Sequence, residues 1–190
     1  MDKWAHLGHV LGECWNDPVR STTFVHIPKN ASSFVKGCLL SSGNFTYSDS
    51  LVGADQYLIT LRDPIERWAS GIAQFMSVEA NKHLSIDDLV NTVTFDDHTE
   101  LQTYFLQGVD LNKCVFLKVN ADLKSNIKLW LQKNGYIVDV DHLPIINQGD
   151  AILKNKFAAM VDGNNQIKLN LTKHYATDYE LINRVKFYGT

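Results

Sequence analysis

The 190-residue chain has few cysteines and no long apolar run. Its three cysteines, Cys14, Cys38 and Cys114, are widely spaced and form no CxxC pair, so the sequence predicts neither a disulfide framework nor a cysteine-based zinc site. This usage favours a reducing compartment. The first 23 residues are interrupted by histidine and acidic side chains and lack the apolar core of a signal peptide or a spanning helix. We therefore expect a soluble, cytoplasmic protein with no membrane span.

A strong excess of one charge is also missing. Eighteen Lys and Arg stand against 21 Asp and Glu, for a net charge of −3. No global positive field attracts nucleic acid or an anionic membrane, so an anionic ligand must bind at a local site. There is no internal repeat, low-complexity tract or Pro/Gly-rich linker, and we expect one domain over residues 1–190. Within it, residues 1–21 are interpreted as an N-terminal extension and 22–190 as the core.

What the chain does contain is an alternation of strand and helix patterns. Short apolar, β-branched stretches predict strands at 22–27, 57–61 and 114–119. Helical patterns follow at 32–40, 62–76, 85–93, 98–106, 121–135 and 171–189. Strands that alternate with helices predict an α/β domain with a mostly parallel central sheet flanked by helices.

Capping residues indicate where three of these helices begin. Ser32 or Ser33 is expected to cap the first helix. Asp63 is expected to cap the next helix, with Pro64 at its first position. Asn120 is the predicted cap of the helix after the third strand. Two of these helix starts directly follow a predicted strand.

Basic side chains stand at the ends of two predicted strands. Lys29 precedes a helix N-terminus that carries the hydroxyls of Ser32 and Ser33, which together suit a phosphate group. Arg62 ends the second strand, and Ser70 lies on the helix that follows. Because ligands collect at the carboxyl ends of parallel strands, the two loops are expected to share one crevice that suits two separated phosphates. Lys29 does not follow a glycine run, so the pattern is not a Walker loop.

Each of these residues also has a plainer interpretation. Lys29 would then be a solvated loop lysine, and Arg62 would form an ion pair with Asp63 or Glu66. Ser70 would be a neutral packing serine on its helix. Under this alternative the protein is an α/β interaction domain with no bound nucleotide.

The combination of the two segments resembles a known family. "FVHIPKNASSF" and "LITLRDPIERWASG" are similar to the two phosphate-binding motifs of sulfotransferases that use 3′-phosphoadenosine 5′-phosphosulfate (PAPS), especially the Golgi-type carbohydrate sulfotransferases. The later segments "VFLKVNADLKSNIKLWLQKNG", "LPIINQGD" and "HYATDYELI" also resemble that family, so the likeness runs from Phe24 to the C-terminus. The resemblance implies a P-loop-like sulfotransferase fold in a compact member of the family.

The resemblance also implies a set of donor-binding residues. Lys29 would meet the 5′-phosphosulfate, and Arg62 and Ser70 would hold the 3′-phosphate. The residues that follow Lys29 along the loop would be Asn30, Ala31, Ser32, Ser33 and Phe34. Ser32 stands where the family usually has glycine, which would narrow the loop. PAPS is then the donor, 3′-phosphoadenosine 5′-phosphate (PAP) the product, and no metal is required.

Sulfuryl transfer needs a base for the acceptor hydroxyl as well as a cation at the leaving phosphate. Lys29 can supply the cation, and the resemblance implies an acceptor hydroxyl on a carbohydrate. Some relatives use a Glu on the helix after the loop, but "SFVKGCLLSSG" contains no carboxylate. "DDHTELQ" resembles another family segment and makes His98 the predicted base, as a neutral imidazole near pH 7.

Three other residues, Glu100, Asp97 and His83, come behind His98 as candidate bases. His26 is interpreted as a structural residue of its strand. Because the base is the weakest assignment, the main alternative is a module that binds PAPS or PAP without catalysis. An ATP-dependent P-loop-like kinase is disfavoured, since the sequence shows neither the Walker lysine spacing nor an evident Mg²⁺-binding acid at a strand end.

Overall fold

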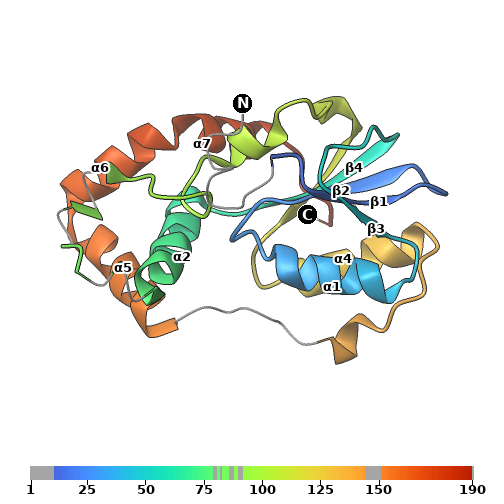
Figure 1. The fold of residues 1–190 in the computed structure, drawn as a ribbon, viewed down its shortest axis with the longest axis horizontal. Coiled ribbons are helices and arrows are strands. Elements are labelled where there is room, and N and C mark those ends of the chain that lie inside the picture. Colours follow the sequence, from blue (N-terminus) through green and yellow to red (C-terminus); the bar gives the residue numbers. More distant parts are fainter. Residues whose placement is uncertain are drawn as a thin grey trace.

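The computed structural model of the chain describes residues 11–78, 81, 83–85, 88, 89, 92–143 and 151–189. Figure 1 shows a sheet with helices beside it and a second group of helices at the other end of the molecule. The strands are β1 (Cys14–Asp17), β2 (Thr22–Val25), β3 (Thr46–Ser48), β4 (Gln56–Leu61) and β5 (Cys114–Lys118). The helices are α1 (Ser32–Ser41), α2 (Pro64–Ser77), α4 (Leu123–Lys133), α5 (Ala151–Gly163), α6 (Asn165–His174) and α7 (Ala176–Arg184). The shorter 3-10 helices are η3 (Gln102–Leu106), η4 (Leu111–Lys113) and η5 (Val140–His142).

The strands form one mixed sheet in the order β3-β1-β2-β4-β5. The pairs β2–β4 and β4–β5 are parallel, whereas β1 pairs antiparallel with both β2 and β3. The predicted α/β class is confirmed, but the expectation of a mostly parallel sheet is wrong for two of the four pairings. The reason is β1, which turns directly back into β2 and cannot run parallel to it. It lies in residues 1–21, which we had interpreted as an extension, yet it is part of the sheet.

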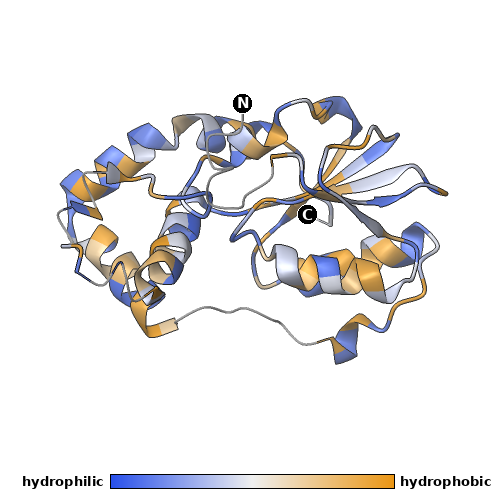
Figure 2. Cartoon of the chain, in the orientation of Figure 1, coloured by the Kyte–Doolittle hydropathy of each residue, from blue (hydrophilic) through white to orange (hydrophobic). Residues whose placement is uncertain are grey.

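Both faces of the sheet are covered. On one face, α1 and α4 lie side by side, and their apolar side chains pack on Phe24, Leu58 and Leu117 (Figure 1). On the other face, η3 and α7 cover the strands through Phe105 and Leu181. Figure 2 shows helices that mix apolar and hydrophilic residues along their length, which is expected of elements with one buried face.

The second group of helices has its own core. Helix α2 packs on α5, and Trp68 contacts Phe157 with ring centroids 6.3 Å apart. Leu171 of α6 and Tyr175 at the start of α7 complete this cluster and are fully buried. Helix α2 starts at the sheet, after β4, and runs into the helical group, so it joins the two parts. None of the helices that the structure describes is both long and apolar enough to cross a bilayer.

The helix starts agree only in part with the sequence. Asp63 caps α2 as predicted, because its Oδ1 accepts from the Glu66 N–H at 2.9 Å, with Pro64 as the first residue. Neither serine caps α1, whose N-cap is Ala31 with φ 57° and no side-chain hydrogen bond. The cap of α4 is Asp122, two residues after the predicted Asn120.

Two further helices were predicted on less certain patterns. The pattern at 98–106 forms only the 3-10 helix η3, because the residues before it are a loop of turns. The predicted helix at 85–93 and the "LPIINQGD" segment each lie partly outside the described residues.

Gly135 follows α4 with φ 73°, as expected for the residue that stops it.

Candidate anion-binding site

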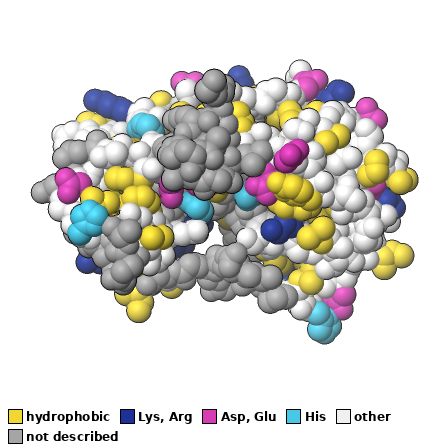
Figure 3. Space-filling model, viewed as in Figure 1, with side chains coloured by type: hydrophobic (Ala, Val, Ile, Leu, Met, Phe, Trp, Pro, Cys, Tyr) yellow, Lys and Arg dark blue, Asp and Glu magenta, His cyan; other side chains and the backbone are white. Residues whose placement is uncertain are grey.

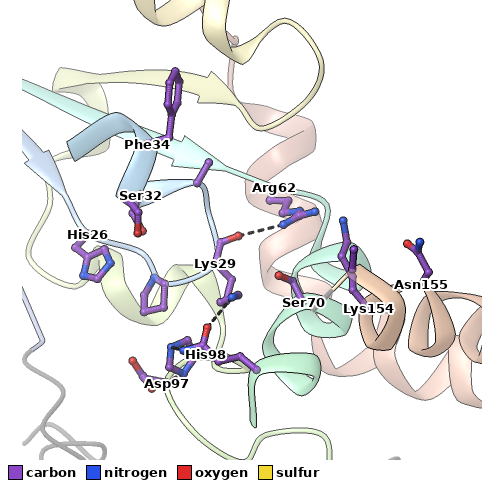
Figure 4. Close-up of a pocket in the computed structure, with 15 residues that line it drawn as sticks. His26, Lys29, Ser32, Phe34, Arg62, Ser70, Asp97, His98, Lys154 and Asn155 are labelled. Atoms are coloured by element: carbon purple, nitrogen blue, oxygen red, sulfur yellow. Dashed lines mark hydrogen bonds and ion pairs between the residues drawn. The ribbon is translucent and has the colours of Figure 1, made fainter. Parts of the chain in front are cut away.

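A cavity of about 490 Å³ lies at the carboxyl ends of β2 and β4. Its walls come from the β2–α1 loop, the end of β4, helix α2, the loop before η3 and the first turn of α5. Figure 4 shows these side chains around Lys29, and Figure 3 shows the hollow from one side with basic and histidine side chains at its margin. The structure thus brings Lys29, Arg62 and Ser70 to one cavity.

The β2–α1 loop shapes the wall around Lys29. Lys29 and Ala31 both have left-handed backbone conformations, with φ of 65° and 57°. Such conformations cost about 1 kcal/mol or more for residues other than glycine, and they cluster at binding sites. The loop delivers the first turn of α1 to the cavity, where Ser32 and Ser33 lie. A helix N-terminus there attracts an anion.

The Lys29 ammonium is half-buried and donates to Gln74 Oε1 at 2.7 Å. Its pKa lies below the ordinary value for lysine, because burial disfavours the charge and the guanidinium groups of Arg62 and Arg67 repel it. An anion that enters the cavity would offset this repulsion and stabilise the charged form of Lys29. The plainer interpretation of a solvated surface lysine therefore does not describe Lys29.

Two residues of the predicted donor loop have side chains that point elsewhere. Asn30 is fully buried outside the cavity lining, and its Nδ2 donates to Thr60 O at 2.6 Å and to Gln102 Oε1 at 2.7 Å. Phe34 is one of the residues that line the cavity, but its ring points away into the core beneath α1, and its N–H donates to Ala31 O at 3.0 Å. Asn30 therefore holds the loop by hydrogen bonds to β4 and η3, and Phe34 packs the start of α1 on the core.

Arg62 lies at the end of β4, and its Nη1 donates to the Lys29 carbonyl at 3.4 Å. Its Nε is 3.4 Å from Glu66 Oε2, so the ion pair considered from the sequence is present. Glu66 is largely exposed, and exposed pairs of this kind are weak. The Arg62 guanidinium can therefore still bind an anion in the cavity. Arg62 lines this cavity together with the nearly buried Ser70.

Helix α5 adds a basic residue that the sequence analysis missed. Lys154 lines the cavity opposite the β2–α1 loop, and Asn155 lies beside it (Figure 4). Burial and the nearby charge of Arg62 lower the pKa of Lys154, which places the two cations close together. No motif surrounds Lys154, so only the packing of α5 on α2 reveals it.

His98 lies in the loop before η3, and both of its ring nitrogens have partners. Nδ1 is 3.0 Å from Asp96 Oδ2 and 3.1 Å from Asp97 Oδ1, and Nε2 is 3.1 Å from Gln74 Nε2. Burial alone would lower the pKa of His98, but the two carboxylates outweigh it and raise the value to about 9. From the sequence we expected a neutral imidazole near pH 7, whereas the two carboxylates favour the imidazolium.

The same three side chains bear on metal binding. Ligand atoms of Asp96, Asp97 and His98 lie within 4.8 Å of one another, close enough to hold an ion. From the sequence we expected no metal, and named His98 and Asp97 only as candidate bases.

The other candidate bases are less well placed. Glu100 is buried, and its Oε1 accepts from the Leu101 N–H at 2.9 Å. Neither Glu100 nor His83 lines the cavity, whereas Asp97 does. His26 also lines it, although we had interpreted this residue as structural.

Arg67 connects two walls of the cavity through hydrogen bonds. It is fully buried, and its guanidinium donates only to carbonyl groups: to Pro28 O at 2.9 Å, to Asp97 O at 3.2 Å and to Glu100 O. The first carbonyl belongs to the β2–α1 loop and the other two to the His98 loop. Arg67 therefore fixes the spacing between Lys29 and the His98 loop.

A buried carboxylate supports the same region from α7. Asp178 accepts from the Gln102 N–H at 2.8 Å and from the Thr103 N–H at 2.9 Å. The Gln102 side chain in turn accepts from the Arg62 N–H at 3.0 Å and donates to the Arg62 carbonyl at 2.9 Å. The late segment with Asp178 is thus connected to the end of β4.

Gly71 is a second residue whose role the sequence did not reveal. A Cβ added there would lie 2.5 Å from the His98 carbonyl oxygen. We expect Gly71→Ala to lower the free energy of unfolding by about 1 to 3 kcal/mol and to displace the His98 loop. The clashing atom is a backbone oxygen, which cannot move aside as easily as the end of a flexible side chain. Thermal denaturation measures the effect.

The matched control is Gly37→Ala on α1, where no atom lies within 4 Å of the added Cβ. That variant should gain about 0.5 to 1 kcal/mol from the better helix propensity of alanine. Equal stability of the Gly71 and Gly37 variants would show that α2 and the His98 loop are not in tight contact.

Comparison of the chain with protein-family models, curated proteins and solved structures found no match in any of the three. The likeness to PAPS-dependent sulfotransferases therefore rests on the motif residues.

Proposed function

We propose that this protein is a PAPS-dependent sulfotransferase with a P-loop-like sulfotransferase fold, which moves a sulfuryl group to a hydroxyl on a carbohydrate. The observation that carries the proposal is the convergence of Lys29 with Arg62 and Ser70 on one cavity at the ends of two parallel strands. PAPS carries a phosphate at the 3′ position and a phosphosulfate at the 5′ position. A cavity with two separate cationic regions suits such a donor.

The proposed roles follow from position. The 5′-phosphosulfate would lie against Lys29 and the α1 N-terminus, where Ser32 and Ser33 offer hydroxyls. The 3′-phosphate would lie against Arg62 and Ser70. Lys29 stabilises the charge that develops on the leaving phosphate, which is where preorganised positive charge contributes most. Arg62 orients the donor and does not touch the reacting bond.

Lys154 lies on the Arg62 side of this cavity (Figure 4). In the proposed complex its ammonium and that of Lys29 would neutralise opposite ends of the donor.

A non-catalytic module that binds PAPS or PAP is the second candidate. The observation in its favour is the environment of His98, since the predicted base is held beside two carboxylates and a glutamine amide. A kinase that uses ATP fits the cavity less well, because the β2–α1 loop lacks the glycine run of a Walker loop.

The donor assignment predicts a nucleotide preference. PAP should raise the melting temperature of the protein far more than ADP, since ADP has no 3′-phosphate for Arg62 to bind; saturation at 100 times Kd corresponds to about 2.7 kcal/mol. Arg62→Ala should weaken PAP binding by about tenfold or more and leave ADP binding nearly unchanged. Thermal shift and calorimetric titration measure both effects.

The control is Arg184→Ala, which removes an exposed arginine outside the cavity and should change neither affinity. Equal shifts with PAP and ADP, or unchanged PAP affinity in the Arg62 variant, would refute the two-phosphate assignment.

A further inference from the structure

His26, which lines the cavity, belongs to a second histidine–carboxylate pair. His26 follows β2, and its Nδ1 lies 3.0 Å from Glu13 Oε2. The backbone supports the same pairing, because the His26 N–H donates to the Glu13 carbonyl at 3.0 Å. The rings of Trp15 and His26 pack edge to face, with centroids 5.6 Å apart. The ring of His26 is therefore fixed, with Nδ1 directed to the carboxylate.

The pairing determines which ring nitrogen is available. When Nδ1 carries the proton that Glu13 accepts, Nε2 has a free lone pair. Among the described residues, none is hydrogen-bonded to Nε2 of His26. Both side chains are partly open to solvent, at 23% for His26 and 22% for Glu13, so the pair is not enclosed in the core. In contrast, both ring nitrogens of His98 are engaged.

The position of His26 suits the far end of the donor. In Figure 4, Lys29 lies between Arg62, Ser70 and Lys154 on one side and the two histidines on the other. If the 3′-phosphate lies on the Arg62 side and the 5′-phosphate at Lys29, the sulfuryl group extends toward the histidines. An acceptor hydroxyl must approach the sulfur from that end.

We propose that His26, oriented by Glu13, is the general base that takes the proton of the acceptor hydroxyl; this inference rests on the proposed sulfotransferase function. In the step, the acceptor oxygen forms a bond to sulfur while the bond from sulfur to the 5′-phosphate oxygen breaks. The electron pair of the broken bond stays on the phosphate of PAP, next to Lys29. The acceptor proton moves to Nε2 of His26. Glu13 is a positioning residue that also stabilises the imidazolium formed.

Charged groups lie near His26 on several elements. Glu13 faces it from the preceding segment and Lys29 from its own loop. Asp97 and His98 line the cavity from the loop before η3. Lys36 of α1 lies over the Trp15 ring, at 5.0 Å from the centroid, on which His26 also packs.

The test measures PAP release from PAPS, with 4-nitrophenyl β-galactoside as the hydroxyl probe, and PAP affinity in parallel. His26→Asn keeps an amide donor for Glu13 and should lower kcat by about 100-fold or more, with PAP affinity unchanged within about twofold. Glu13→Gln should lower kcat by about tenfold, because the imidazole loses the carboxylate that orients it.

The matched control is His142→Asn, because His142 also pairs with a carboxylate, Asp139, but is 86% exposed and lies outside the cavity. It should leave kcat unchanged. Near-normal kcat in His26→Asn with intact PAP binding would overturn the base assignment alone. PAP binding without any turnover of the probe or of water in the wild type would overturn the base and favour the non-catalytic module. Absence of PAP binding would refute the proposed function itself.

Discussion

Replacement of Lys29 with methionine is expected to lower turnover of PAPS by about 100-fold or more, because a preorganised charge at the leaving phosphate acts mainly in the transition state. Affinity for PAP should fall much less, since Arg62 and Ser70 still hold the 3′-phosphate. The measurement is kcat for PAP release together with PAP affinity by calorimetry. A Lys29→Met enzyme with turnover within about threefold of wild type would contradict the mechanism.

The same substitution should not destabilise the fold. The pKa of Lys29 is lower in the folded chain than in the unfolded chain, chiefly through burial and repulsion from Arg62. A lysine with a lowered folded pKa opposes folding at any pH below its unfolded pKa, and the opposition disappears as pH rises above that value. At pH 7 the melting temperature of Lys29→Met should therefore equal or exceed that of the wild type. The exposed Lys173→Met variant serves as the control and should retain both turnover and stability.

Replacement of Arg67 with methionine is expected to have the largest effect on stability. The substitution leaves the carbonyls of Pro28, Asp97 and Glu100 without their buried donor. Loss of charged hydrogen bonds of this kind should lower the free energy of unfolding by about 3 kcal/mol or more. Denaturant titration measures it, and PAP affinity should fall as well, because the Lys29 loop loses its support.

Arg67→Lys tests whether geometry or charge matters, since one ammonium cannot reproduce the planar arrangement of donors. It should recover little of the lost stability. The exposed Arg184→Met variant should stay within about 0.5 kcal/mol of the wild type. An Arg67→Met protein as stable as that control would show that the three carbonyls find other donors.

Local signals in the sequence predicted several elements well. The apolar runs predicted β2, β4 and β5, and the start of α2 was predicted from Asp63 and Pro64 because a cap and a proline act within one turn of the helix. Local signals failed where the conformation of an adjoining loop determines where a helix begins. Ala31 is the N-cap of α1 in place of either serine, because the loop enters the helix through a left-handed residue.

The candidate site shows the same division. Lys29 and Arg62 could be predicted because each lies beside a strand end and a helix start that have their own signals, whereas Ser70, within α2, was predicted only from the resemblance of its segment; the structure gathers all three at one cavity. Lys154 and Gly71 could not, since neither has a local pattern and each matters only through a contact between distant segments.

The sequence by itself determined the α/β class, the order of strand and helix units and the two basic strand ends, because hydrophobic periodicity and capping are properties of neighbouring residues. Only the tertiary structure decided the mixed character of the sheet, in which β1 returns antiparallel beside β2. It also decided the orientation of His26, because folding brings Glu13 to its Nδ1. The carboxylates beside His98 are its sequence neighbours Asp96 and Asp97, but the burial of that group depends on the packing of distant segments.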